Sequence, residues 1–195
     1  MMEQSSPQFS DFLLSLPAFL IALVVHEYAH GYVANKLGDN TAKQMGRLTF
    51  NPLAHIDPMG TIFLPLFLIL TRAPFIFGWA KPVPVNFSNL RNPKKHMIWV
   101  GLAGPAANFA LAILIFLLLS LKIPGIPVFS AFLVNVMIIN IFLGAFNLIP
   151  IPPLDGSRIL MGLLPHRLSI AYSRLERYGI IILMMFLLLI RRFIL

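Results

Sequence analysis

The chain contains no cysteine and few charged residues, and both absences narrow what it can be. Without cysteine it has neither disulfides nor thiolate metal ligands. Charged residues occupy 11% of the 195 positions, whereas a soluble domain carries about 25%. Apolar residues occupy 58%, and the mean hydropathy is +0.83. This composition predicts an all-α, polytopic integral membrane protein with a single domain, residues 1–195.

Acidic residues are the scarcest charged group, with seven Asp and Glu against 15 Lys and Arg. A basic excess can indicate binding to nucleic acid. Here most basic residues lie between apolar runs, as they do in the cytoplasmic loops of membrane proteins. We therefore expect the lipid bilayer, and no nucleic acid, as a partner of the chain.

Four apolar runs are candidates for spanning helices, because a helix needs ~20 apolar residues to cross the hydrocarbon layer. Three of them form the expected core, and the fourth ends the chain: 12–37, 97–121, 126–149 and 178–195. A fifth run, 60–77, contains Pro65, Arg72 and Pro74 and has basic residues on both flanks. Both flanks are then cytoplasmic. We expect 60–77 to be re-entrant or interfacial, with a true crossing as the alternative.

The same distribution of basic residues orients the core helices. The first and third run inward, so that the polar motifs at their ends face the cytoplasm. The sequence thus predicts a multi-pass protein of the cell membrane whose polar site lies toward the cytoplasmic side.

The segment VVHEYAHGYVANK (24–36) places His26, Glu27 and His30 inside an apolar run. Residues four apart share one face of a helix, so both imidazoles can bind one zinc ion while the glutamate serves as general base. Histidines packed beside a helix end are the alternative. Ionisable groups within a membrane span are costly and indicate function. We predict a metal site at these residues.

Two histidines do not complete such a site, since a catalytic zinc usually has three protein ligands. In a chain without cysteine the third is His, Asp or Glu. Asp155 lies in FNLIPIPPLDGSRIL, six residues beyond the 126–149 run. The prolines before it end the helix and let the chain turn the carboxylate back toward the bundle. A helix N-cap at Asp155 is the alternative.

These residues resemble the site-two protease family of intramembrane zinc metalloproteases over about residues 15–165. Three motifs occur in the family's order: HEYAH (26–30), AGPAANF (103–109) and NLIPIPPLDG (147–156). Two further segments resemble the short, minimal prokaryotic branch: NPLAHIDPMG (51–60) and GWAKPVPVN (78–86).

The resemblance implies a zinc endopeptidase that hydrolyses peptide bonds in or near transmembrane segments of other membrane proteins, in regulated intramembrane proteolysis. It implies one Zn²⁺ per chain, held by His26, His30 and Asp155, with Glu27 as the general base. It also implies that Asn147, and Asn108 as a weaker candidate, contact the substrate backbone or the developing oxyanion. An interhelical hydrogen bond is the alternative for Asn108.

Small residues around 101–107 predict close packing of this helix against the zinc helices, and Asn140 is expected to be structural. The segment GWAKPVPVN predicts a strand of a short β-hairpin, because Pro82 and Pro84 leave donors along one edge only. That edge, with Val83 at its centre, could bind an extended substrate. A plain surface hairpin is the alternative. His55 and Asp57 are interpreted as loop structure, with an auxiliary metal or gating role as the alternative.

Two other functions fit parts of the pattern. A divalent-metal transporter would place further polar residues along a path to the opposite face, and the outer halves of the helices offer almost none. A catalytically inactive scaffold would not need Glu27.

Overall fold

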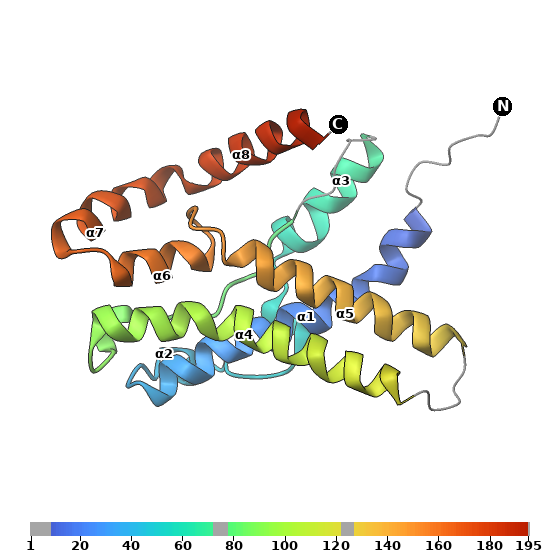
Figure 1. Cartoon of the computed structure of the whole chain (residues 1–195), viewed down its shortest axis with the longest axis horizontal. Helices are drawn as coiled ribbons and strands as arrows, with labels where there is room; N and C mark the ends of the chain where they lie inside the picture. The colour runs from blue at the N-terminus through green and yellow to red at the C-terminus, as the bar shows by residue number, and fades with distance from the viewer. Residues whose placement is uncertain (1–8, 72–77, 122–126, 195) are drawn as a thin grey trace.

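The computed structural model describes residues 9–71, 78–121 and 127–194, and every regular element in these ranges is helical (Figure 1). The long helices are α1 (Phe9–Lys36), α4 (Pro93–Ser120) and α5 (Pro127–Asn147). Five helices are shorter: α2 (Thr41–Gln44), α3 (Leu64–Leu70), α6 (Asp155–Leu163), α7 (His166–Ser173) and α8 (Gly179–Ile194). Brief 3₁₀ or π-helical turns cover Pro52–His55, Pro58–Phe63, Phe87–Asn89 and Arg174–Tyr178.

Three helices are long and apolar enough to cross a membrane: Ser15–Lys36, Pro93–Ser120 and Phe129–Asn147. The helical prediction is therefore confirmed for the described residues, and three of the predicted runs form helices that could span a membrane. The last helix, α8, has 16 residues, fewer than the ~20 that a crossing requires. The fourth span stays a prediction.

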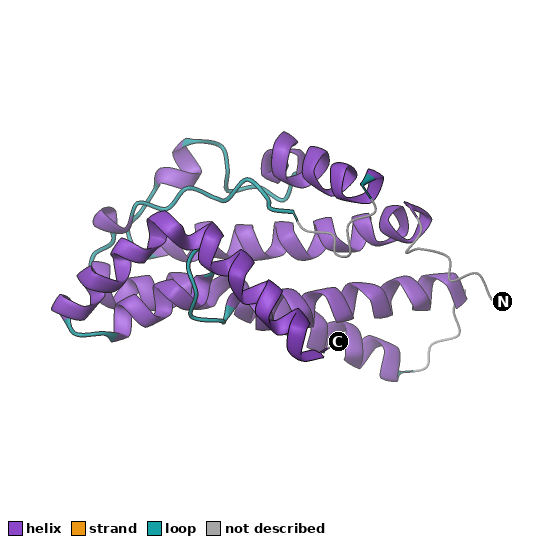
Figure 2. Ribbon diagram, turned by 90° about the horizontal axis from the view of Figure 1, so that it is seen from above, coloured by secondary structure: helices purple, strands orange, loops and turns teal. Residues whose placement is uncertain are grey.

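The three long helices lie side by side and share a core (Figures 1 and 2). Ala18 of α1, Ile115 of α4 and Val136 of α5 form a buried apolar cluster where the helices meet. On the outer faces, Phe116 is 59% exposed and Phe142 is 68% exposed. Apolar surface of this extent in a polytopic chain is suited to lipid, so the bundle buries its polar residues inside and turns its apolar ones outward.

Two glycines of α4 allow the close packing that the sequence predicted. A Cβ at Gly101 would lie 3.2 Å from the Asp155 carbonyl oxygen, so α6 rests directly on the α4 backbone there. Gly104, one turn later, faces the two histidines of α1. Ala106 is exposed and points away from these contacts. The close packing of α4 therefore depends on the small residues at 101 and 104.

The predicted re-entrant run contains a short helix rather than a span. The π-helical turn Pro58–Phe63 continues into α3, and the combined helix is too short to count as a candidate span. Residues 72–77 of the run lie outside the described residues. Asp57 caps this helix by accepting from two backbone amides, and the fully buried His55 hydrogen-bonds to the Thr49 carbonyl at 2.9 Å. Both residues are loop structure, as predicted.

The prediction of a β-hairpin at 78–86 is wrong, since this stretch pairs with no strand in the part of the chain that the structure describes. Pro82 and Pro84 have no N–H, which prevents a continuous ladder on one side. On the other side, Lys81 N–H donates to the His55 carbonyl at 3.0 Å. Val83 N–H donates to the Glu27 carboxylate instead of to a backbone carbonyl. The 78–86 segment is thus irregular and is hydrogen-bonded to the loop at His55 and to α1 at Glu27.

Candidate metal centre and active site

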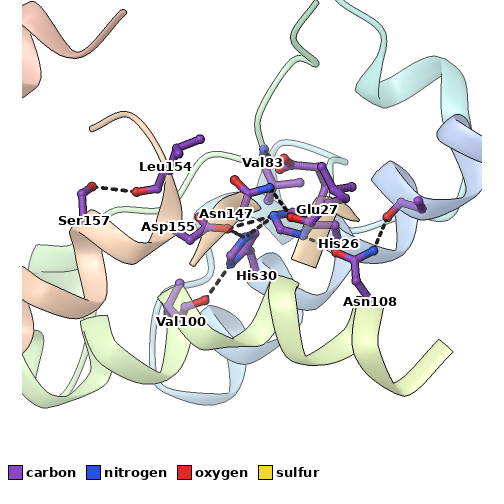
Figure 3. A network of polar contacts seen from close by, with 12 residues as sticks. His26, Glu27, His30, Val83, Val100, Asn108, Asn147, Leu154, Asp155 and Ser157 are labelled. Atoms are coloured by element: carbon purple, nitrogen blue, oxygen red, sulfur yellow. Dashed lines mark hydrogen bonds and ion pairs between the residues drawn. The ribbon is translucent and has the colours of Figure 1, made fainter. Parts of the chain in front are cut away.

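The structure brings the three predicted metal ligands together (Figure 3). His26 and His30 lie one turn apart on α1, and their Nε2 atoms are 3.0 Å from each other. Asp155 is the first residue of α6, and its Oδ2 lies 2.9 Å from His26 Nε2 and 3.1 Å from His30 Nε2. Three atoms that metals bind therefore meet at one point, although His30 and Asp155 are 125 residues apart.

The second nitrogen of each histidine fixes the orientation of its ring. His26 Nδ1 lies 2.6 Å from Asn108 Oδ1, and His30 Nδ1 lies 2.6 Å from the Val100 carbonyl oxygen. Both oxygens only accept, so each Nδ1 carries the proton that it donates. In the neutral imidazole each Nε2 then presents a lone pair toward the other and toward the Asp155 carboxylate. Such a convergence of electron pairs is stabilised by a cation.

Gly104 of α4 keeps the space beside these nitrogens open. A Cβ at this position would lie 2.4 Å from His30 Nε2 and 2.7 Å from His26 Nε2. Zinc binds imidazole nitrogen at about 2.0–2.1 Å and prefers the His and Asp donors present here. The donor set, the fixed ring orientations and this opening all fit a zinc ion.

Asp155 reaches the histidines because the chain turns sharply before it. A Cβ at Gly156 would lie 2.3 Å from the Leu148 carbonyl oxygen, so glycine is needed for the start of α6 to fold onto the end of α5. The N-cap position of α6 is Leu154, which forms no side-chain cap. The Asp155 carboxylate instead faces the two rings, with Oδ2 2.9 Å from His26 Nε2 and 3.1 Å from His30 Nε2. The structure favours the ligand interpretation over the N-cap.

Glu27 lies between the two histidines in sequence and is half-buried. Its Oε2 accepts the Val83 backbone N–H at 2.7 Å, so the 78–86 segment fixes the direction of the carboxylate (Figure 3). Sequence reasoning placed Val83 at a substrate-binding edge and missed this contact. The predicted substrate-binding edge is therefore not free at Val83, whose amide is already hydrogen-bonded to Glu27, and the Lys81 amide is bonded to the His55 carbonyl.

Asn108 is fully buried at the centre of a polar network between the helices. Its Nδ2 donates to the Ala22 carbonyl at 2.9 Å and to Asn140 Oδ1 at 2.7 Å, while its Oδ1 pairs with His26. The structure therefore supports the interhelical alternative for Asn108 and adds a role that the sequence did not reveal, which is to orient a metal ligand. Asn140 is structural, as predicted, and also donates to the Val136 carbonyl.

Asn147, the last residue of α5, is half-buried and donates through Nδ2 to the Leu143 carbonyl of its own helix at 3.0 Å. Its Oδ1 has no hydrogen-bond partner among the residues that the structure describes. The structure therefore leaves one polar atom of this side chain available at the end of the helix that precedes Asp155.

The fold and the metal centre define a helical membrane metalloprotease, and comparison with known families agrees. Residues 14–132 and 125–190 match the model of peptidase family M50. The chain belongs to this family, which is the site-two protease family of intramembrane zinc metalloproteases.

Relatives in bacteria and archaea carry matching names. YwhC of Bacillus subtilis is 41% identical over 188 residues, which cover 90% of this chain and 82% of YwhC. Rip2 of Mycolicibacterium smegmatis is 30% identical over 172 residues, covering 88% of this chain and 65% of Rip2. MJ0611 of Methanocaldococcus jannaschii is 32% identical over 158 residues, covering 80% and 74%. Each bears the description "Putative zinc metalloprotease". No solved structure matches the chain.

Proposed function

We propose that the chain binds one zinc ion and hydrolyses peptide bonds in or near the transmembrane segments of other membrane proteins, in regulated intramembrane proteolysis. The observation that carries the proposal is the convergence of His26 Nε2, His30 Nε2 and Asp155 Oδ2 beside Glu27, on helices that can cross a membrane. When bound, zinc would polarise the scissile carbonyl and lower the pKa of the attacking water.

Glu27 would act as the general base. Its carboxylate takes the proton from the attacking water and delivers it to the departing amine. The hydrogen bond from Val83 N–H engages Oε2 and leaves Oε1 to accept the proton. His26 and His30 would hold the zinc ion, with their rings oriented by Asn108 and the Val100 carbonyl.

Asn147 would contact the substrate backbone or the developing oxyanion. Its half-buried position before the turn to Asp155 and the unpaired Oδ1 support this role, although its Nδ2 would have to leave the Leu143 carbonyl in order to donate. Val83 would belong to the substrate site through its position beside Glu27 rather than through its amide. A substrate helix must unwind there, because peptide hydrolysis needs an accessible backbone.

The proposal places the protein in the cell membrane as a multi-pass protein, with the site toward the cytoplasm, α8 as a fourth span and Pro58–Leu70 as a re-entrant helix. Cysteines introduced singly at Asn40 and Asn92 test this topology. Both residues are exposed, and the chain has no native thiol. A membrane-impermeant maleimide should label both only from the cytoplasmic side. Labelling from opposite sides would show that the intervening run crosses the membrane.

The metal assignment is tested by Asp155→Ala. Removal of one of three protein ligands should lower the zinc content of the purified protein from about one ion per chain to a small fraction, because zinc binding depends on all three donors. Elemental analysis measures this content, and cleavage of a membrane-protein substrate should fall with it. The control is Asp57→Asn, which changes an acidic N-cap elsewhere in the chain. Full zinc and full activity in Asp155→Ala would show that the third ligand lies elsewhere.

A further inference from the structure

The fully buried carboxylate of Asp39 holds the 78–86 segment against the loop that follows α1. Asp39 lies between α1 and α2 and is 0% exposed. Its Oδ2 accepts the Asn86 backbone N–H at 2.7 Å, across 47 residues of sequence. Its Oδ1 accepts the Asn89 side-chain amide at 3.1 Å, and Thr41 donates to the same oxygen through its backbone and its hydroxyl. Neither oxygen is left unpaired.

Asp39 is charged in the folded protein. Burial by itself would raise the pKa of its carboxyl, but the hydrogen bonds from Thr41, Asn89 and Asn86 outweigh this effect and lower the pKa below its ordinary value. Hydrogen bonds to an ionised acceptor are roughly twice as strong as those between neutral groups. The attachment at Asn86 is therefore a strong one for a segment that has no regular secondary structure.

The same segment touches α1 itself at Val83, three residues before Asn86. The Val83 N–H binds Glu27, and a Cβ at Gly31 would lie 2.9 Å from Val83 Cγ1. Gly31 lies one helical turn beyond Glu27, so the absence of a side chain there lets Val83 approach the helix closely. Pro84 lies between the two attachment points, and its ring limits the backbone rotation that could separate them.

We propose that Asp39 is a positioning residue for the general base. By fixing Asn86, it keeps the Val83 N–H in place, and this N–H in turn fixes the Glu27 carboxylate. A general base must remain within about 2.6–3.2 Å of the proton that it removes, and the long Glu27 side chain has several rotatable bonds. The inference rests on the proposed function of Glu27 and adds a residue outside the metal centre to the catalytic arrangement.

The test compares Asp39→Asn, Val83→Pro and the double variant in the full-length protein. Asparagine has the same shape, but its amide group cannot accept at both positions, so one attachment of the segment is lost. Val83→Pro deletes the N–H that binds Glu27. For Asp39→Asn we expect kcat to fall about tenfold, less than the ~10²-fold loss of the base itself, because Glu27 remains present. KM and zinc content should stay unchanged, and hydrogen exchange should accelerate at 83–89 but not in α1 or α4.

The double variant separates positioning from a general structural effect. If Asp39 acts through the Val83 N–H, the double variant should lose no more kcat than the worse single variant. Asp57→Asn provides the matched control and should keep wild-type kcat, since it changes a cap that does not contact 83–86. If Asp39→Asn does not fold, Asn89→Ala removes one donor to Asp39 and should show a smaller kcat loss that is likewise non-additive with Val83→Pro.

Three results would overturn the inference. They are wild-type kcat despite faster exchange at 83–89, additive losses in the double variant, and a loss confined to KM, which would assign the segment to substrate binding alone. Failure of the proposed function would appear differently, as wild-type turnover in Glu27→Gln.

Discussion

Replacing Glu27 with Gln should reduce cleavage by at least ~10²-fold, the usual loss when a general base is removed. Glutamine is nearly isosteric, and its carbonyl oxygen can still accept the Val83 N–H that now binds Oε2. It cannot take a proton from water. The metal ligands are untouched, so the purified variant should keep its zinc and should still bind substrate.

Single-turnover cleavage of a membrane-protein substrate, measured together with zinc content, checks this expectation. The matched control is Glu176→Gln. Glu176 forms a partly exposed ion pair with Arg158 at 2.8 Å, and such pairs contribute at most about 1 kcal/mol. The control should therefore cleave at nearly the wild-type rate. Wild-type turnover in Glu27→Gln would exclude the protease mechanism.

Replacing Gly104 with Ala should abolish zinc binding, and activity with it. The added methyl carbon would lie 2.4 Å from His30 Nε2 and 2.6 Å from His26 Cε1. Both rings are buried and held by hydrogen bonds through Nδ1, so they cannot move aside without losing those partners. We expect zinc content to fall more than tenfold, in line with the ~10–100-fold losses of metal affinity that changes around metal ligands produce.

Gly144→Ala is the control for a methyl group added to a buried helix. Its Cβ would lie 3.2 Å from the Phe109 ring, a contact that a small shift of this side chain can relieve. This variant should retain zinc. Full zinc occupancy in Gly104→Ala, measured on protein of unchanged thermal stability, would show that the ion does not lie beside the α4 backbone.

The candidate metal ligands could be predicted because each carries a chemical signature. The spacing of His26 and His30 matches one helical turn, and a charged residue in an apolar run needs a partner. The absence of cysteine limited the remaining ligand to a few acids, and the prolines before Asp155 indicated the turn that brings it back. The three long helices were also predictable, although α4 begins at Pro93, four residues before the predicted Met97, because Asn92 caps its first turn.

The sequence by itself determined the class of protein, the three helices that could span a membrane and the residues of the candidate metal site, since hydropathy and motif spacing are local properties. The tertiary structure alone decided that the 78–86 segment is no strand, that Asn108 orients His26, and that Asp39 and Val83 converge on the helix that carries Glu27. These roles depend on hydrogen bonds between residues 47 to 82 positions apart. The periodicity of the sequence cannot predict such contacts, because a backbone N–H or a buried amide acquires its partner only when the helices pack and water is excluded.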